Sequence, residues 1–262
     1  MYQTWFAALL ISGCAFSAIP GETSDGTEGP DAGAGVSPDD DGGTVPARRC
    51  TDPSTRLCVD FESLTPLRDE LGATISAVGL RLEPRGAEQA VAVTTSSELR
   101  VAETPRLDLA TNLTIEMWIK PEPALFVTMG LLHNAGQYAL AYQGDGEVRC
   151  QLGSDRVESR RPVSPGGWHH VACTLVNGEL RLYIDGSLDD CENAPAAIPT
   201  SGTGGTVIGA YNLDGSRFAP FVGQLDNVRI HGRAFTPQEL CDISGSTTCT
   251  ATCPTGGGSG PG

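Results

Sequence analysis

Two runs of alternating apolar and polar residues are separated by a single Asn-Gly dipeptide, Asn177-Gly178. The first run covers residues 168–176, and the second covers residues 179–186. Alternation with a period of two places the apolar side chains on one face of a strand. Asn-Gly suits a two-residue turn, because both turn residues must adopt a positive φ. The sequence therefore predicts an antiparallel β-hairpin over residues 168–186.

Similar alternation recurs through most of the chain between Cys50 and Cys253. Further strands are predicted at residues 113–120, 138–142, 148–152, 207–210 and 221–230. Together they indicate about a dozen short strands at intervals of about ten residues, which favours a β-sandwich. The composition agrees, because 33 glycines, 18 prolines and only 19% charged residues suit short strands joined by turns. We therefore predict an all-β fold.

One short helix is predicted near the C-terminus. Thr236 has the properties of an N-cap, Pro237 suits the first helical position, and Glu239 completes a capping box. Phe235 and Leu240 form the hydrophobic contact that often accompanies such a cap. We expect the apolar side of this helix to pack against the edge of the sandwich.

Residues 1–14 have the pattern of an export signal. A short apolar run, too short to span a bilayer, ends in small residues before Cys14. Ile11–Cys14 resembles a bacterial lipobox, in which the cysteine is lipidated, although residues 1–4 lack the positive charge usual in export signals. The alternative is an ordinary secretory signal that is cut between Ala15 and Ala18. Both interpretations predict export, and the lipobox also predicts a lipid anchor in the cell envelope, at the outer membrane or the cell surface.

Residues 15–47 have the composition of a disordered acidic Gly/Asp/Pro tether. They contain seven acidic residues and no Lys or Arg, and they lack the apolar residues needed to fold. The rest of the chain holds 25 of the 32 acidic residues against 17 basic residues, which excludes a phosphate-binding surface for nucleic acid. The folded domain is predicted at residues 48–253, and residues 254–262 form a flexible Gly/Ser/Pro tail. Membrane contact is expected only through the lipid anchor.

Nine cysteines are an odd number, and Cys14 is set apart by its lipobox position. The other eight can pair completely in an exported protein, and their spacing lacks the close pairs and histidine partners of a zinc site. The candidates for disulfide bonds are Cys50, Cys58, Cys150, Cys173, Cys191, Cys241, Cys249 and Cys253.

The connectivity is not fixed by the sequence, since eight cysteines can pair in many ways. Cys50 with Cys58 would close a short loop at the entrance of the domain. Cys150 and Cys173 each lie at an apolar position of the alternating pattern, in two strands that are expected to pair. Of the three cysteines at the exit, Cys241, Cys249 and Cys253, two are expected to pair with each other and the third with Cys191.

Five segments resemble, in order and spacing, the signature strands of the LamG-like jellyroll family of the laminin G and concanavalin A-like lectin/glucanase superfamily. They are Leu113–Pro121, Gly167–Ala172, Leu180–Gly186, Phe221–Ile230 and Arg233–Phe235. The resemblance covers residues 58–242. It implies a two-sheet antiparallel jellyroll sandwich of the concanavalin A type. It also implies a binding or adhesion module for a carbohydrate or protein ligand, a common role in the family.

The catalytic residues of enzymes with this fold are not recognisable in the sequence. Glucanases of this fold set paired carboxylates along one strand, whereas the nearest pair here, Glu116 and Glu122, ends in a proline-rich turn. There is no Gly-x-Ser-x-Gly motif, and no histidine is expected to contact a nucleophilic Ser or Cys. His169 and His170 are expected to face opposite sides of one strand, and His133 and His231 to lie at strand ends without partners. We therefore predict that the protein is not an enzyme.

Asp226 is the candidate metal ligand, because its position in the last strand can turn its carboxylate inward. The resemblance implies a structural Ca²⁺ held between this residue and oxygens near the start of the domain, at Asp60 or Glu62. The alternative is that an Arg side chain or backbone N–H groups satisfy Asp226. The sequence does not choose between the two.

The candidate ligand contacts are Tyr211, Asn212, Asp214 and Arg217, in a polar loop where an aromatic ring and polar groups can bind a sugar. The alternative is a plain surface loop. The predicted function is therefore a surface-tethered binding module for a carbohydrate or protein ligand. The second hypothesis is a structural or interaction protein of the envelope without a soluble ligand, and glycoside hydrolysis is the least favoured. The sequence specifies no oligomeric state.

Overall fold

The computed structural model describes residues 50–123, 127–195, 197–199, 204–213 and 215–254. The predicted signal with Cys14, the tether at residues 15–47 and residues 255–262 of the tail lie outside the described residues. None of the helices among the described residues has the length and apolar character that a membrane span requires.

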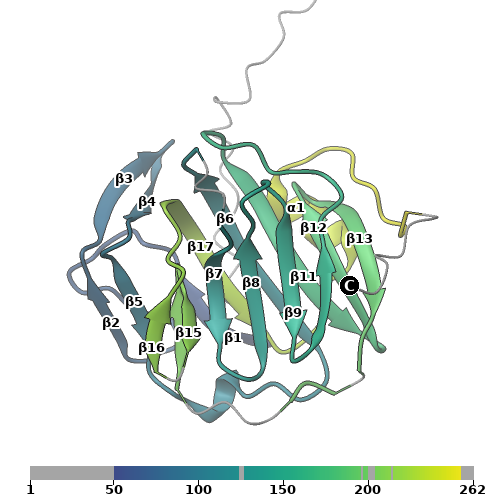
Figure 1. Cartoon of the computed structure of the whole chain (residues 1–262), viewed down its shortest axis with the longest axis horizontal. Helices are drawn as coiled ribbons and strands as arrows, with labels where there is room; N and C mark the ends of the chain where they lie inside the picture. The colour runs from purple at the N-terminus through teal and green to yellow at the C-terminus, as the bar shows by residue number, and fades with distance from the viewer. Residues whose placement is uncertain (1–49, 124–126, 196, 200–203, 214, 255–262) are drawn as a thin grey trace, which may run out of the picture. The chain divides into compact units, whose positions relative to one another are not determined.

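Two large antiparallel sheets form the predicted sandwich (Figure 1). Sheet A contains, in spatial order, β13 (Ser187–Asn193), β12 (Glu179–Ile184), β11 (His169–Val176), β6 (Leu113–Pro121), β17 (Gly223–His231), β4 (Glu88–Val93) and β3 (Arg81–Arg85), with β1 (Thr55–Val59) also paired to β17. Sheet B contains β10 (Asp155–Glu158), β9 (Val148–Leu152), β8 (Tyr138–Tyr142), β7 (Met129–Asn134), β14 (Thr206–Ile208), β5 (Glu98–Val101) and β2 (Ile75–Val78).

Three smaller elements complete the described structure. The strands β15 (Tyr211–Leu213) and β16 (Ser216–Phe218) form a separate hairpin, η1 (Pro105–Leu107) is a single 3-10 turn, and α1 (Pro237–Ser244) is the C-terminal helix. The predicted capping box is confirmed, since Thr236 accepts from the backbone of Glu239 and the Glu239 carboxylate accepts from the backbone of Thr236. The helix adds Leu240 to a small cluster with Ala172, Tyr183 and Leu188 on sheet A.

The Asn-Gly hairpin is confirmed as β11 and β12, with Val176 opposite Glu179. Asn177 has a φ of 52° and Gly178 a φ of 76°, the positive values that this turn requires. Apolar residues of alternate phase, such as Ile115 and Met117 of β6, point into a core that is filled from both sheets.

Four disulfides join the eight predicted cysteines. They are Cys50–Cys58, Cys150–Cys173, Cys191–Cys253 and Cys241–Cys249. The expectation that Cys150 and Cys173 lie on neighbouring strands is wrong, because β9 belongs to sheet B and β11 to sheet A. The two side chains are fully buried and meet because the inner faces of the sheets oppose each other. This disulfide therefore links the two sheets across the core.

We expect the double variant Cys150→Ala/Cys173→Ala to lose about 3 kcal/mol of unfolding free energy, because the crosslink closes a loop with a sequence separation of 23. Removing Cys50–Cys58, whose separation is 8, should cost about 1 kcal/mol less. Urea denaturation measures both values, and peptide mapping of the unreduced protein checks the four pairs. Equal losses, or different pairs, would contradict the assignment.

Candidate functional site

The hairpin β15–β16 lies on the outer face of sheet B, in front of its central strands (Figure 1). Its base touches β7, where the backbone N–H of Gly130 donates to the carbonyl of Ala219 at 2.9 Å. A Cβ atom at Gly130 would lie 2.3 Å from the backbone of Ala210 and Tyr211. Only glycine therefore permits the hairpin to approach the sheet this closely.

Two polar side chains anchor this hairpin. The amide nitrogen of Asn212 donates to the carbonyls of Gly204 and Gly205 at 3.0 and 3.3 Å, and its Oδ1 accepts from Gly215 at 3.1 Å. Arg217 donates to the carbonyl of Thr95. Asn212 is only 2% exposed, so its predicted role as a ligand contact is replaced by a role in holding the hairpin. Asp214, the other predicted contact, lies outside the described residues.

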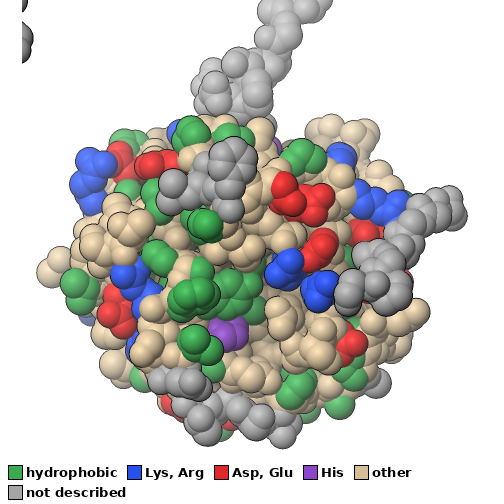
Figure 2. All heavy atoms as spheres, viewed as in Figure 1, with side chains coloured by type: hydrophobic (Ala, Val, Ile, Leu, Met, Phe, Trp, Pro, Cys, Tyr) green, Lys and Arg blue, Asp and Glu red, His purple; other side chains and the backbone are tan. Residues whose placement is uncertain are grey.

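The exposed side of the hairpin is apolar and aromatic. Tyr211 lies directly opposite Phe218 in the register, and Phe218 and Leu213 are 60% and 59% exposed. Figure 2 shows hydrophobic side chains gathered over β7 and the hairpin, with arginine and acidic side chains toward β9. The arrangement places an aromatic surface beside a charged one on the same face of the molecule.

His133 of β7 supports the aromatic surface. Its ring contacts Tyr211 edge-on, with ring centroids 5.1 Å apart. The backbone N–H of Asn212 donates to Nδ1 of His133 at 2.8 Å, so the neutral imidazole carries its hydrogen on Nε2. Burial lowers the pKa of His133, which favours this neutral form. His133 was expected to have no partner, and this contact corrects that expectation.

The charged part of the face comes from β9 and β10. Arg149 donates from Nε to Glu158 at 2.7 Å and from Nη2 to Gln143 at 2.5 Å, so its guanidinium is held in place. Between Arg149 and the hairpin, β8 turns only the small side chains of Ala139 and Ala141 outward, because its tyrosines point into the core. Both alanines are buried, so the aromatic surface and the charged one adjoin each other over β8, where Arg149 interacts electrostatically with Tyr211.

A cavity of about 140 Å³ opens beside His133, between the β7–β8 and β9–β10 turns. Its described lining consists of His133, Gly136, Gln137, Tyr138, Ala139, Gln151 and Gly153. Gln151 donates from its amide nitrogen to the carbonyl of Gly153 at 2.7 Å. We call this cavity, together with Tyr211 and Phe218, the sheet B site. The sequence indicates Tyr211 but gives no signal for the cavity, whose residues come from strands β7, β8 and β9 and from two turns and form no motif.

Asp226 has the partner that the sequence analysis gave as the alternative to calcium. Arg85 of β3 places Nη1 2.6 Å from Oδ2 of Asp226. The backbone N–H of Asn227 donates to Oδ1 at 2.7 Å. The guanidinium of Arg85 lies 4.2 Å from the ring centroid of Trp118 and 5.0 Å from that of Trp168, which holds it over the carboxylate.

The proposed calcium ligands do not gather around Asp226 in the described structure. Glu62 is exposed, and its Oε1 accepts from the backbone of Gln89 at 3.2 Å. Asp60 is half-buried in the segment after β1. Among the described residues, only Glu179, Cys191 and Cys253 group at metal-binding distance, and those cysteines form a disulfide. This donor set does not fit Ca²⁺, because a guanidinium already occupies the cation position beside Asp226.

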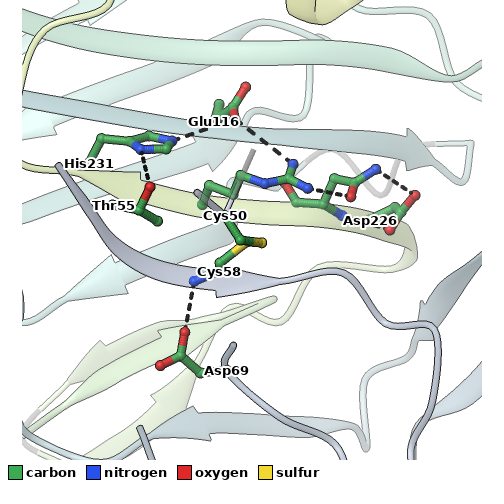
Figure 3. Close-up of a disulfide and its surroundings, with 9 residues drawn as sticks. Cys50, Thr55, Cys58, Asp69, Glu116, Asp226 and His231 are labelled. Atoms are coloured by element: carbon green, nitrogen blue, oxygen red, sulfur yellow. Dashed lines mark hydrogen bonds and ion pairs between the residues drawn. A yellow bond between two sulfur atoms is a disulfide. The ribbon is translucent and has the colours of Figure 1, made fainter. Parts of the chain in front are cut away.

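A second buried carboxylate, Glu116 of β6, lies near the Cys50–Cys58 disulfide (Figure 3). His170 Nε2 lies 3.0 Å from its Oε2, and His231 Nε2 and Arg229 Nη1 lie 3.6 and 3.9 Å from its Oε1. Burial raises the pKa of Glu116, but the contacts with these three residues outweigh burial and hold the pKa well below its usual range. The expectation that His231 has no partner is therefore wrong.

Ser164, His169 and Asp185 form a row of hydrogen bonds that the sequence analysis did not expect. Ser164 Oγ lies 3.1 Å from His169 Nε2, and His169 Nδ1 lies 2.9 Å from Asp185 Oδ2. The other oxygen of Asp185 accepts from the backbone of His170 at 2.9 Å. The row connects the end of the β11–β12 hairpin with the loop before it. The order of groups is that of a catalytic triad, but the side chain of Asp185 is 47% exposed, whereas the aspartate of a triad is buried.

Comparison with protein families gives one match, to the concanavalin A-like lectin/glucanases superfamily, over residues 93–241. A search of curated proteins finds no match. The described strands from β6 to β17, including the whole sheet B site, fall inside the matched range.

Similar folds occur among solved structures. Domain 4 of AbnA, a GH43 extracellular arabinanase from Geobacillus stearothermophilus in complex with arabinotriose, aligns with a TM-score of 0.58 at 18% identity, covering 73% of this chain and 98% of that one. The binding domain of botulinum neurotoxin DC in complex with rat synaptotagmin II gives a TM-score of 0.58 at 10% identity, covering 73% and 51%. A structure of botulinum neurotoxin type C, a toxin whose cell entry depends on interaction with two ganglioside molecules, aligns with a TM-score of 0.56 at 13% identity. The alignment covers 76% of this chain and 52% of that one. This chain thus spans about half of the toxin chains.

We expect EDTA to leave the melting temperature unchanged, because Arg85 rather than an ion neutralises Asp226. Arg85→Gln should instead lower the unfolding free energy by about 3 kcal/mol, because the buried carboxylate loses its partner. Thermal melting with EDTA and with added Ca²⁺ checks the first expectation. A melting temperature that falls in EDTA and recovers with Ca²⁺ would restore the calcium interpretation.

The pH dependence of stability separates the two buried carboxylates. Burial raises the pKa of Asp226 from 3.8 to about 7, with Glu88 adding to the effect and Arg85 opposing it. As the pH rises through this window the unfolded chain releases the proton first, so the folded state loses stability between pH 3.8 and about 7. Glu116 acts in the opposite direction and only as the pH falls below 4.5.

Asp226→Asn should therefore flatten the stability profile between pH 5 and about 7, whatever its effect on stability at a single pH. Urea unfolding of both proteins across this range measures the slope. An identical slope in wild type and variant would show that another group titrates there.

Proposed function

Because this chain belongs to the concanavalin A-like lectin/glucanase superfamily, we propose that its folded domain is a non-catalytic binding module and that the sheet B site binds carbohydrate. The observation that carries the proposal is the aromatic surface of half-buried Tyr211 and exposed Phe218, which lies next to a polar cavity on a rigid sheet. Sugar rings stack their apolar faces on aromatic side chains, while their hydroxyl groups need nearby hydrogen-bond partners.

The relatives of known structure support a binding role without naming the ligand of this chain. The arabinanase domain was solved with a trisaccharide, and the toxin structures concern gangliosides and a protein receptor. A protein ligand at the same surface is the second candidate, because Phe218 and Leu213 form an exposed apolar area that also suits a protein partner.

The buried and exposed acids argue against glycoside hydrolysis. Both oxygens of Glu116 are paired within the protein, Oε2 with His170 and Oε1 with His231 and Arg229, so the carboxylate is not free to act on a glycosidic bond. Ser164 lies in an exposed loop, and its row ends in an aspartate that water reaches. These features support a structural role for both groups.

We further propose that the domain works outside the cytoplasm, tethered to the cell envelope through Cys14 and residues 15–47. Four disulfides support an oxidising compartment, where such bonds form and persist. Incorporation of labelled palmitate in a bacterial host that lipidates proteins, lost in Cys14→Ser, tests the anchor.

A glycan array probed with the full chain tests carbohydrate binding. We expect reproducible hits, and Tyr211→Ala and Phe218→Ala should each weaken binding about 10-fold, the value of one stacking contact. Val78→Ala is the matched control, since Val78 is 65% exposed on the edge strand β2 of the same sheet. A blank array with capture of a protein partner would favour the second candidate. Equal losses of glycan binding in all three variants would show that the sheet B site is not where the glycan binds.

A further inference from the structure

One residue that lines the cavity of the sheet B site has a buried amide without a partner. Within the described residues, Gln137 is 1% exposed and neither its Nε2 nor its Oε1 has a hydrogen-bond partner. The backbone of Gln137 is fixed, because its N–H donates to Asn134 and its carbonyl accepts from Gly153, both at 3.1 Å. Buried amides are almost always paired, so an unpaired one beside a cavity points to a group that enters from outside.

The cavity is neutral as well as polar. None of its described lining residues carries a formal charge, since His133 is held in its neutral form by Asn212. The nearby cation, Arg149, is already bound by Glu158 and Gln143. A carboxylate in this cavity would lose its hydration without gaining a cation, whereas hydroxyl groups would gain partners.

The size of the cavity limits what enters it. About 140 Å³ has room for four or five water molecules. This is enough for the hydroxyl-bearing edge of one sugar ring but too small for a chain of sugars. His133 lies in the lining and also contacts Tyr211, so a sugar in the cavity would place its neighbour against the aromatic surface.

We propose that the cavity selects the terminal residue of a neutral glycan, and that the unpaired Gln137 amide turns into the cavity and binds two adjacent hydroxyl groups, donating from Nε2 to one and accepting at Oε1 from the other. His133 Nε2–H supplies a further donor. This inference rests on the proposed carbohydrate function. It adds the class of sugar, the end of the glycan that is bound and a residue that determines specificity.

The test compares two sets of printed glycans with the full chain, neutral oligosaccharides that include arabinotriose and oligogalacturonides that end in a uronate. We expect at least 10-fold stronger binding to the neutral set. Gln137→Leu should weaken this binding about 10-fold, because two hydrogen bonds are lost. The matched control is Gln224→Leu, a half-buried glutamine of β17 in sheet A, which should bind as the wild type does.

Thermal melting distinguishes recognition from a structural role. Gln137→Leu removes an unpaired buried amide, so its melting temperature should equal or exceed that of the wild type. A lower melting temperature together with weaker binding would show that Gln137 only supports the fold. Hits that Gln137→Leu leaves unchanged, or stronger binding to uronates, would overturn this inference alone. A blank array for the wild type would overturn the carbohydrate function with it.

Discussion

The burial of alternate side chains between the two sheets is the constraint on which every site in this structure depends. In β6, Ile115 and Met117 fill the core, so Glu116 must lie on the outer face. A shift of one residue in the register would exchange these faces and place a carboxylate in the core. The Cys150–Cys173 disulfide crosses the same core and fixes the two inner faces against each other. The positions of the outward residues follow from this packing, except where a β-bulge at Asn227 interrupts the alternation in β17.

The outer faces of sheets A and B then differ in what their side chains contact. On sheet A, outward residues make structural contacts, because Glu116 pairs with both His170 and Arg229 and the helix adds Leu240 to the cluster on Tyr183. On sheet B, a hairpin covers only part of the face and leaves an aromatic edge and a cavity beside it. The candidate ligand site therefore lies on sheet B, where an exposed aromatic side chain adjoins a polar cavity.

The sequence predicts local features well because the residues that determine them are neighbours. The turn at Asn177-Gly178, the capping box at Thr236 and the alternating strands are all confirmed by the structure. The partner of Asp226 is different, because Arg85 lies 141 residues away and only the sheet topology brings the two together. Asn212 shows the same limit, since a polar loop residue can face either the solvent or the carbonyls beneath it. Gln137 gives no signal at all, because a glutamine in a turn is ordinary until the structure shows that it is buried and unpaired.

The contrast between Asp226 and Gln137 explains how a buried polar group can indicate either stability or binding. Both are almost fully buried, but Asp226 has a cation, a backbone N–H and two tryptophans that hold its partner in place. An ion that bound there would have to displace Arg85 and disturb the stack. Gln137 has a fixed backbone and, among the described residues, no partner for its side-chain amide, so the amide can turn to a ligand hydroxyl without breaking a hydrogen bond of the protein. Binding at Gln137 therefore costs the protein no existing contact, and this difference decides which of the two groups a ligand can use.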